Sequence, residues 1–228
     1  MDHHTNILRI KAVANALDSL NEKVVFIGGA TVSLYVSRPV MEIRPTDDVD
    51  VIIEILNYKE RAELEERLRK IGFSNDIDSG IVCRYKIHSI VVDIMPTNDP
   101  SIGFSNKWYQ EGFENSVDYK IDEYCSVKIL DAPYFIATKI EAFKGRGKND
   151  GRMSQDFEDI VFVLENRESI WQEINELEGD ISTYLKNEFK ELLKNKYLAE
   201  WIDSHVERVS PPATYIILDE IKNFVSRN

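Results

Sequence analysis

The spacing of apolar residues at the start of the chain predicts a helix, a strand and a tight turn in succession. Apolar residues recur every three or four positions over residues 7–20, as they do along one face of an amphipathic helix. The apolar run at 24–27 has the length of a buried strand, and it stops at Gly28 and Gly29. Residues 30–35 are expected to leave this glycine turn as a helix.

The next part of the chain continues this mixture of strands and helices. A strand is predicted at 48–53, where apolar and polar residues alternate, and a helix over 64–71. Two more strands are predicted at 81–87 and 90–94. Only residues 88–89 separate them, which is the length of a β-hairpin turn.

Beyond about residue 130 the apolar spacing is helical. It marks three clear stripes, over residues 157–164, 181–192 and 217–225. We therefore expect an α+β protein with a mixed α/β domain over residues 1–130 and an all-helical domain over residues 131–228.

The composition is that of a globular protein and excludes several classes. The 228 residues are 43% hydrophobic and 30% charged, which excludes a disordered or collagen-like chain. The 28 basic and 40 acidic residues give a net charge of −12, so a protein that coats DNA electrostatically is not expected. Two cysteines make no disulfide framework, and no apolar run approaches the length of about 20 residues that spans a bilayer. With no signal-peptide segment at the N-terminus, we expect a cytoplasmic protein without membrane association.

The most informative chemistry is a group of aspartates on predicted strands. If residues 48–53 form a strand, Asp48 and Asp50 share one face. Such neighbouring carboxylates repel each other unless a cation lies between them, and hard oxygen ligands suit Mg²⁺ or Mn²⁺. Asp93 lies in an otherwise apolar strand and needs a partner, which a shared metal site beside Asp48 and Asp50 would supply. Three such carboxylates can hold two divalent ions about 4 Å apart.

Each part of this pattern also has an ordinary structural interpretation. A lone Asp-x-Asp is often a solvated strand end, a pair of glycines is a generic turn, and one aspartate in an apolar strand can be satisfied by hydrogen bonds. Only their combination, in this order and spacing, favours a metal site.

The combination resembles the nucleotidyltransferase superfamily related to DNA polymerase β. Its pattern of a strand, two small residues, a helix, Asp-h-Asp and a later Asp matches Gly28, Gly29, Asp48, Asp50 and Asp93. Within that superfamily the chain is most similar to the AbiEii/AbiGii-type toxin branch, in which Arg-x-Thr-x-Asp-h-Asp is typical. The matching residues of that motif which precede the aspartates are Arg44 and Thr46.

The resemblance continues into the second half of the chain. Residues 135–143, followed by Gly-Arg-Gly at 145–147, are similar to the lysine motif of that branch, and residues 156–159 are similar to its Asp-x-x-Asp motif. The likeness spans about residues 20–165. It implies a small mixed-sheet, polymerase β-like domain followed by a helical domain.

The resemblance also implies roles for the aspartates in the reaction. Asp48, Asp50 and Asp93 would be the metal ligands and, with Lys139, the catalytic residues. Asp48 and Asp50 would hold both ions, and Asp93 would bind one ion and help to deprotonate the acceptor.

Other matching residues are candidates for nucleotide binding. Gly28 and Gly29 would let backbone N–H groups approach a triphosphate beside a helix N-terminus, and Thr31 could donate a hydroxyl hydrogen bond. Arg44 could pair with a phosphate or a carboxylate, or form a structural ion pair. Thr46 is a candidate through the motif alone.

Lys139 lies in an apolar helical stretch. It either extends to solvent or contacts a phosphate, and the motif favours the phosphate. Asp156 and Asp159 could orient Lys139 or contact a nucleotide, although acidic residues in a first helical turn also complement the helix dipole. The basic residues of segment 139–152 are the best candidates for meeting a phosphate-bearing substrate in so acidic a chain, although a solvated loop is the ordinary interpretation of such a run.

The implied activity is transfer of an NMP group from an NTP to an acceptor hydroxyl, with release of pyrophosphate. The branch implies a toxin in a toxin–antitoxin or phage-defence system, with an RNA acceptor such as tRNA and a cognate antitoxin as partner. Two alternatives stay open: an antibiotic nucleotidyltransferase acting on an aminoglycoside-like acceptor, which the acidic composition favours, and a catalytically silent nucleotide-binding module.

Overall fold

The computed structural model describes residues 2–37, 44–55, 57–98, 106–148, 150–207 and 213–227. The chain forms two compact units. The first, the sheet unit, comprises Met1–Leu34 and Met41–Asp131, and the second, the helical unit, comprises Tyr35–Val40 and Ala132–Asn228. Within the described residues, no helix is both long and apolar enough to cross a membrane.

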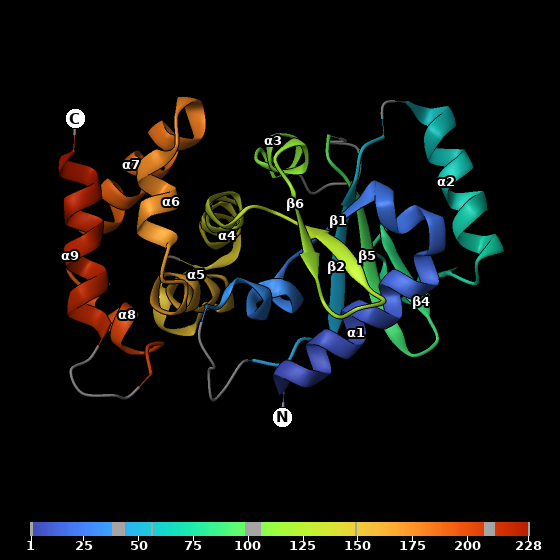
Figure 1. Cartoon of the computed structure of the whole chain (residues 1–228), viewed down its shortest axis with the longest axis horizontal. Coiled ribbons are helices and arrows are strands. Elements are labelled where there is room, and N and C mark those ends of the chain that lie inside the picture. The colour runs from blue at the N-terminus through green and yellow to red at the C-terminus, as the bar shows by residue number, and fades with distance from the viewer. Residues whose placement is uncertain are drawn as a thin grey trace. The chain divides into compact units, whose positions relative to one another are not determined.

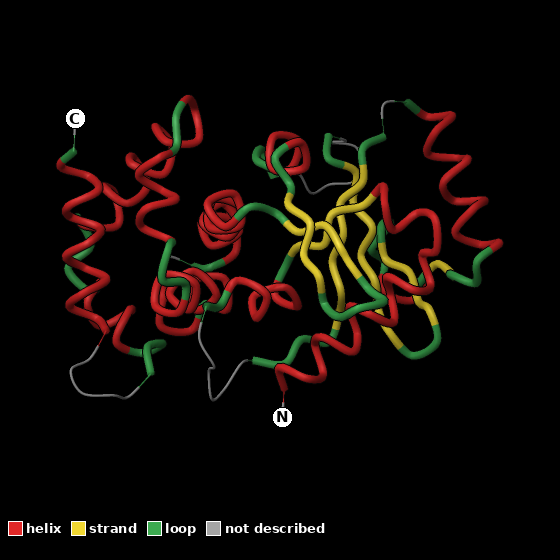
Figure 2. The backbone as a smooth tube through the Cα atoms, in the orientation of Figure 1, coloured by secondary structure: helices red, strands yellow, loops and turns green. Residues whose placement is uncertain are grey.

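The sheet unit is built on one mixed sheet. Its described strands are β1 (Val24–Ile27), β2 (Asp48–Ile53), β3 (Ser74–Asn75), β4 (Arg84–Ile87), β5 (Ile90–Pro96), β6 (Val117–Lys120) and β7 (Ser126–Ile129). They run in the order β3-β4-β5-β2-β1-β7-β6, shown in yellow in Figure 2. The pairs β2–β5 and β1–β7 are parallel and the others are antiparallel. All four residues of β1 are buried, as expected of a central strand.

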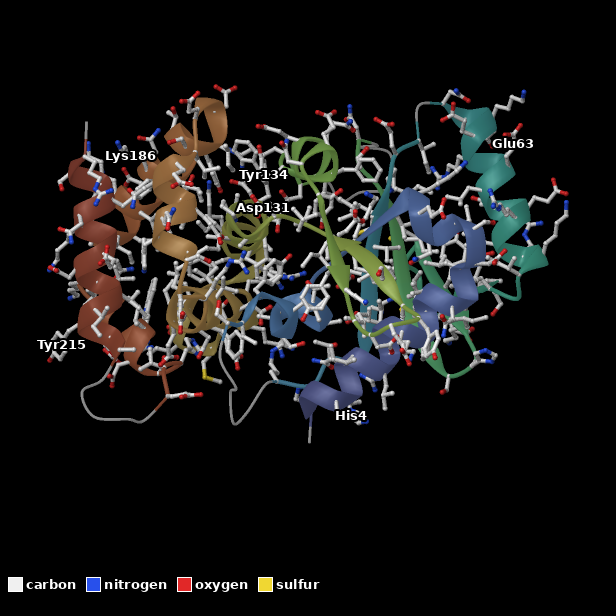
Figure 3. All side chains as sticks on the ribbon, in the orientation of Figure 1. His4, Glu63, Asp131, Tyr134, Lys186 and Tyr215 are labelled. Atoms are coloured by element: carbon white, nitrogen blue, oxygen red, sulfur yellow. The ribbon has the colours of Figure 1, made fainter. Side chains whose placement is uncertain are left out.

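Helices cover this sheet and connect its strands. They are α1 (Asp2–Leu17), α2 (Tyr58–Lys70) and α3 (Tyr109–Glu114), with 3₁₀ turns η1 (Asp18–Lys23), η2 (Gly29–Tyr35) and η3 (Ile77–Ser79). The buried residues Ile10, Val13 and Leu17 lie on α1, which packs across β2 and β5 (Figure 1). Glu63, labelled in Figure 3, lies on the exposed side of α2.

The helical unit contains helices and no strand among its described residues (Figure 2). Its elements are α4 (Ala132–Arg146), η5 (Gly151–Met153), α5 (Gln155–Asn166), α6 (Ile170–Glu176), α7 (Gly179–Leu193), α8 (Leu198–Asp203) and α9 (Ala213–Ser226). Helix α4 packs against α5, α6 and α7, so most of its residues are buried. The rings of Phe143, Phe157 and Trp201 form an aromatic cluster in this core, with centroids 5.2–5.9 Å apart.

The mixed α+β fold class predicted from the sequence is confirmed, and two local predictions are corrected. Residues 29–35 form a 3₁₀ rather than an α-helical segment; it begins with a hydrogen bond from the Thr31 N–H to the Gly28 carbonyl, three residues back. The strand predicted at 81–87 begins only at Arg84, because a turn closes with the Arg84 N–H on the Ile81 carbonyl.

Sequence reasoning missed three of the described strands, β3, β6 and β7, and the short helix α3, and it marked no apolar stripe on α6 or α8. β6 and β7 are four residues long, and β6 lies at the edge of the sheet with mostly exposed side chains. Its sequence therefore has little of the apolar signal that marks a strand. Helix α3 is only six residues long, which is too short for a repeating apolar stripe.

Candidate functional site

The strand register brings three carboxylates together on one face of the sheet. Asp50 on β2 stands directly opposite Asp93 on β5 in the parallel pair, and Asp48 lies two residues before Asp50 on the same strand. One carboxylate oxygen from each residue can be chosen so that all lie within 4.8 Å of one another. Asp93 is buried, with 8% of its surface exposed, while Asp48 and Asp50 are half-buried. Three carboxylates at this spacing are a donor set that fits Mg²⁺ or Mn²⁺.

Gly28 allows the carboxylate of Asp50 to take this position. β1 pairs with β2 so that Ile27 lies opposite Asp50, and the chain then turns at Gly28 with a φ of +75°. A Cβ at position 28 would lie 2.0 Å from the Asp50 Oδ2. The position therefore requires glycine for two reasons, its backbone conformation and the close approach of Asp50.

Thr31 stabilises the same turn. Its side chain is fully buried, and its hydroxyl donates to the Gly28 carbonyl at 2.9 Å. Gly29, the other glycine of the predicted site, is the first residue of η2. The hydroxyl proton of Thr31 is thus directed to the backbone of the turn, and a hydrogen bond from this hydroxyl to a nucleotide stays a prediction.

Arg44 and Thr46 lead into the strand that carries Asp48, and a buried asparagine holds them. The Thr46 N–H and hydroxyl lie 3.2 and 3.4 Å from the Asn6 Oδ1, and the Asn6 Nδ2 donates to the Arg44 carbonyl at 3.1 Å. Asn6 lies on α1 and is fully buried. Sequence reasoning missed it, because the contact joins positions about forty residues apart.

Arg84 is the second residue near the carboxylates that sequence reasoning did not assign to the site. It stands opposite Asp93 in the antiparallel β4–β5 pair. Its Nε and Nη2 donate to the two oxygens of Asp93 at 2.8 and 2.7 Å, and Nη2 also lies 3.2 Å from the Asp48 Oδ2. The hydrogen bonds to Asp93 raise the pKa of the Arg84 guanidinium above its ordinary value. Counting back from the two-residue turn at 88–89 pairs residue 84 with residue 93. The predicted hairpin could therefore have indicated that Arg84 lies beside Asp93.

The helical unit brings together the other group of predicted residues. Lys139 on α4 places its Nζ 2.6 Å from the Asp159 Oδ2 and 3.4 Å from the Asp156 Oδ1, both on the neighbouring helix α5. All three residues are buried, with 7% or less of their surface exposed. Arg146 also contacts Asp156, and it donates one hydrogen bond of 2.7 Å to each of the two carboxylate oxygens. The two positive and two negative charges of this group balance.

The environment of Asp156 keeps its carboxyl ionised. Burial alone would raise its pKa, but the hydrogen bonds from Arg146 and the charge of Lys139 outweigh that effect, so the pKa lies below its ordinary value. At the start of α5 the Ser154 hydroxyl accepts a hydrogen bond from the Phe157 N–H and caps the helix.

The basic residues of segment 139–152 are largely neutralised by carboxylates. Besides Lys139 and Arg146, Lys144 lies 2.7 Å from Glu188, and Arg152 lies 2.7 Å from Asp150. This segment is therefore less positive than its sequence indicates.

Two solved structures share the fold of this chain. A protein described as an antigenic nucleotidyltransferase-like protein from Paracoccidioides brasiliensis is 19% identical, with a TM-score of 0.53 over 89% of this chain and 94% of that one. The antibiotic-resistance factor ANT(2'')-Ia, solved in solution, is 15% identical, with a TM-score of 0.50 over 85% of this chain and 97% of that one. At these identities the likeness shows the fold, which is that of the nucleotidyltransferases. No curated protein matches the sequence.

The family itself is shown by the sequence. Residues 12–208 match the model of the family described as "Nucleotidyl transferase AbiEii toxin, Type IV TA system". The chain therefore belongs to the AbiEii nucleotidyltransferase toxin family, as the resemblance noted in the sequence implies.

Proposed function

We propose that this chain is a metal-dependent RNA nucleotidyltransferase and the toxin of a toxin–antitoxin pair. In the reaction, an acceptor hydroxyl oxygen forms a bond to the α-phosphorus of an NTP, the bond to pyrophosphate breaks, and the hydroxyl proton is removed. The observation that carries the proposal is the cluster of Asp48, Asp50 and Asp93 beside a glycine turn, in a chain of this family.

The carboxylates have the central role in this proposal. Asp48 and Asp50 would hold two Mg²⁺ or Mn²⁺ ions, and Asp93 would hold one of them and accept the proton of the acceptor hydroxyl. When bound, the ions would neutralise charge on the phosphates and lower the pKa of the attacking hydroxyl. The spacing of the three carboxylates supports this role.

The residues around the turn would place the triphosphate. Gly28 and Gly29 would offer backbone N–H groups to the phosphates, with Thr31 holding the turn in shape through its bond to the Gly28 carbonyl. Arg44 would contact a phosphate. Thr46 would act through Asn6, by fixing the start of β2.

Residues of the helical unit are also proposed to contact the nucleotide. Lys139 is proposed to contact a phosphate, with Asp156 and Asp159 orienting its ammonium group. The short ion pair between Lys139 and Asp159 supports the orienting role. The proposal divides the chain into a catalytic domain over residues 1–130 and a helical domain over residues 131–228.

The RNA acceptor, with tRNA as the example, rests on the family. So does the cognate antitoxin, and the proposal places the reaction in the cytoplasm, where NTPs and RNA occur together. A second candidate acceptor is a cationic aminoglycoside, which the net charge of −12 favours through electrostatic attraction.

The test is incubation with each α-³²P-labelled NTP, Mg²⁺ or Mn²⁺, and either total RNA or an aminoglycoside. The inactive variant carries Asp48→Asn and Asp50→Asn, which keep the side-chain shapes but remove two charges. The matched control is Asp47→Asn, because Asp47 is the adjacent residue and is exposed. Label in RNA from the wild type and Asp47→Asn, but not from the double variant, is the expected result.

Other outcomes of this assay decide between the alternatives. Label on the aminoglycoside alone would overturn the RNA acceptor and identify an antibiotic-modifying enzyme. Nucleotide binding without transfer to any acceptor would identify a silent binding module. Growth arrest on expression, relieved by Asp48→Asn, is the result expected of a toxin.

A further inference from the structure

Arg84 lies in the sheet beside the aspartates that are the proposed metal ligands. Successive pairing across three strands puts Arg84 opposite Asp93, and Asp93 opposite Asp50. Side chains of directly paired residues lie on the same face of a sheet, about 5 Å apart at Cβ. The register therefore places one guanidinium in the same row as the carboxylates.

The contacts of Arg84 are those of a strong, directional ion pair. Its planar fork engages both oxygens of Asp93 at 2.7 and 2.8 Å, and the same Nη2 reaches Asp48 at 3.2 Å. Such two-point pairs are stronger than ordinary hydrogen bonds, and they hold the carboxylate in a fixed orientation. The side chain of Arg84 is 23% exposed and that of Asp93 12%, so solvent screens the pair only in part.

The positive charge of Arg84 affects how the carboxylates can bind a metal ion. Without a cation, three ionised carboxylates within 4.8 Å would repel one another. One guanidinium offsets a single negative charge of the three. A divalent ion would offset more, but it needs the same oxygens of Asp93 and Asp48, and at these separations it repels the guanidinium.

We infer that Arg84 is a built-in counter-cation of the carboxylate site, which holds Asp93 and Asp48 in place and competes with divalent ions for them. Arg84 therefore sets how tightly the site binds metal. A metal ion binds with lower affinity than it would without Arg84, because it must displace the guanidinium or bind close to its positive charge. This inference rests on the proposed function, since it concerns the metal site of that function.

The test is Mn²⁺ binding measured without nucleotide, by the electron paramagnetic resonance signal of free Mn²⁺. The variants are Arg84→Gln, which removes the charge, and Arg84→Lys, which keeps the charge but loses the two-point contact. The control is Lys86→Gln, which removes one positive charge from the same strand. Lys86 lies two residues further along the same face of this strand, and it pairs with Asp76 at 2.7 Å.

Removal of Arg84 should strengthen Mn²⁺ binding, whereas a substitution that only damaged the structure of the site would weaken it. Arg84→Gln should bind Mn²⁺ about tenfold more tightly than the wild type, equivalent to about 1.4 kcal/mol. Arg84→Lys should fall between the two, and Lys86→Gln should lie within about twofold of the wild type. Equal or weaker binding by Arg84→Gln would overturn the inference, because Arg84 would then only support the structure of the site.

Thermal unfolding provides a second measurement on the same proteins. In a chelator, Arg84→Gln should unfold at a lower temperature than the wild type, since its carboxylates have lost their counter-cation. Saturating Mn²⁺ should raise its unfolding temperature more than that of the wild type. An equal rise in both proteins would contradict the inference.

Failure of the inference is distinguishable from failure of the proposed function. Tighter Mn²⁺ binding by Arg84→Gln, with no NMP transfer by the wild type, would support the counter-cation and overturn the proposed reaction. Transfer by the wild type, with unchanged Mn²⁺ affinity in Arg84→Gln, would do the reverse. No Mn²⁺ binding by any of the proteins would overturn the inference, and the transfer assay would decide the proposed reaction separately.

Discussion

Replacing Gly28 by alanine should damage the carboxylate site by a defined amount. Two effects add. The φ of +75° is unfavourable for alanine by about 1–2 kcal/mol. The new Cβ would also lie 2.0 Å from the Asp50 Oδ2, whereas real Cβ contacts are essentially never shorter than 3.0 Å. Asp50 must therefore move by about 1 Å, or the turn must open by as much.

The second effect sets the expected loss of function. Overpacking of this kind costs about 1–3 kcal/mol, so Gly28→Ala should lower the free energy of unfolding by about 2–5 kcal/mol in all. A displacement of about 1 Å at a reacting centre can cost about 100-fold in rate. Because Asp50 is a proposed metal ligand, Mn²⁺ affinity should fall as well.

A second glycine separates the two effects. Gly80 also has a positive φ, +69°, but a Cβ there would meet nothing within 4 Å. Gly80→Ala should therefore show the conformational cost of about 1–2 kcal/mol and no change at the site.

The assays are urea unfolding, Mn²⁺ binding and NMP transfer for both variants and the wild type. Wild-type Mn²⁺ affinity and transfer rate in Gly28→Ala would refute the reasoning, since Asp50 could then accept a Cβ beside it. An equal loss of function in Gly80→Ala would refute it too, because the loss would come from the backbone alone.

The remaining predictions concern buried polar groups. Lys139→Met should lower the free energy of unfolding by about 3–5 kcal/mol in urea titrations at pH 7, because it removes a buried cation that contacts the carboxylates of Asp159 and Asp156. The exposed Lys190→Met on α7 should change it by less than about 0.5 kcal/mol, and an equal effect of both would contradict the burial argument. Asp156→Asn should be destabilising at pH 7, and less so at pH 3. The folded pKa of Asp156 is below its unfolded value, so its stabilising contribution is present above the unfolded pKa and is lost as the pH falls through the folded pKa. A difference from the wild type that is the same at both pH values would contradict this sign. Asn6→Ala should cost about 2–3 kcal/mol in urea unfolding, because it leaves the buried Thr46 N–H without its acceptor. A change below about 0.5 kcal/mol would show that water replaces the asparagine.

Local pattern accounts for the elements that sequence reasoning predicted well. Alternation over residues 48–53 placed Asp48 and Asp50 on one face, and the two-residue break at 88–89 joined β4 to β5. The fold class and the family were likewise predicted and are confirmed. The roles of the site residues in a reaction stay predictions.

Local pattern fails where an element has little apolar surface or depends on a distant partner. β6 has mostly exposed residues, so it has no clear apolar signal, and it is ordered by its pairing with β7. The sequence around Arg146 is typical of a solvated basic loop. In the structure Arg146 donates hydrogen bonds to Asp156, which is buried on the next helix. Its partner follows from the packing of α4 against α5.

The sequence by itself determined the alternating strands, the helical second half, the shared face of Asp48 and Asp50, and the family. Only the tertiary structure decided that Asp50 lies against Gly28, that Asn6 holds Thr46, and how the strands are ordered in the sheet. The physical reason is that periodicity follows from the geometry of a single strand or helix. Contacts between distant segments depend instead on which faces pack together, and that is set by the whole core.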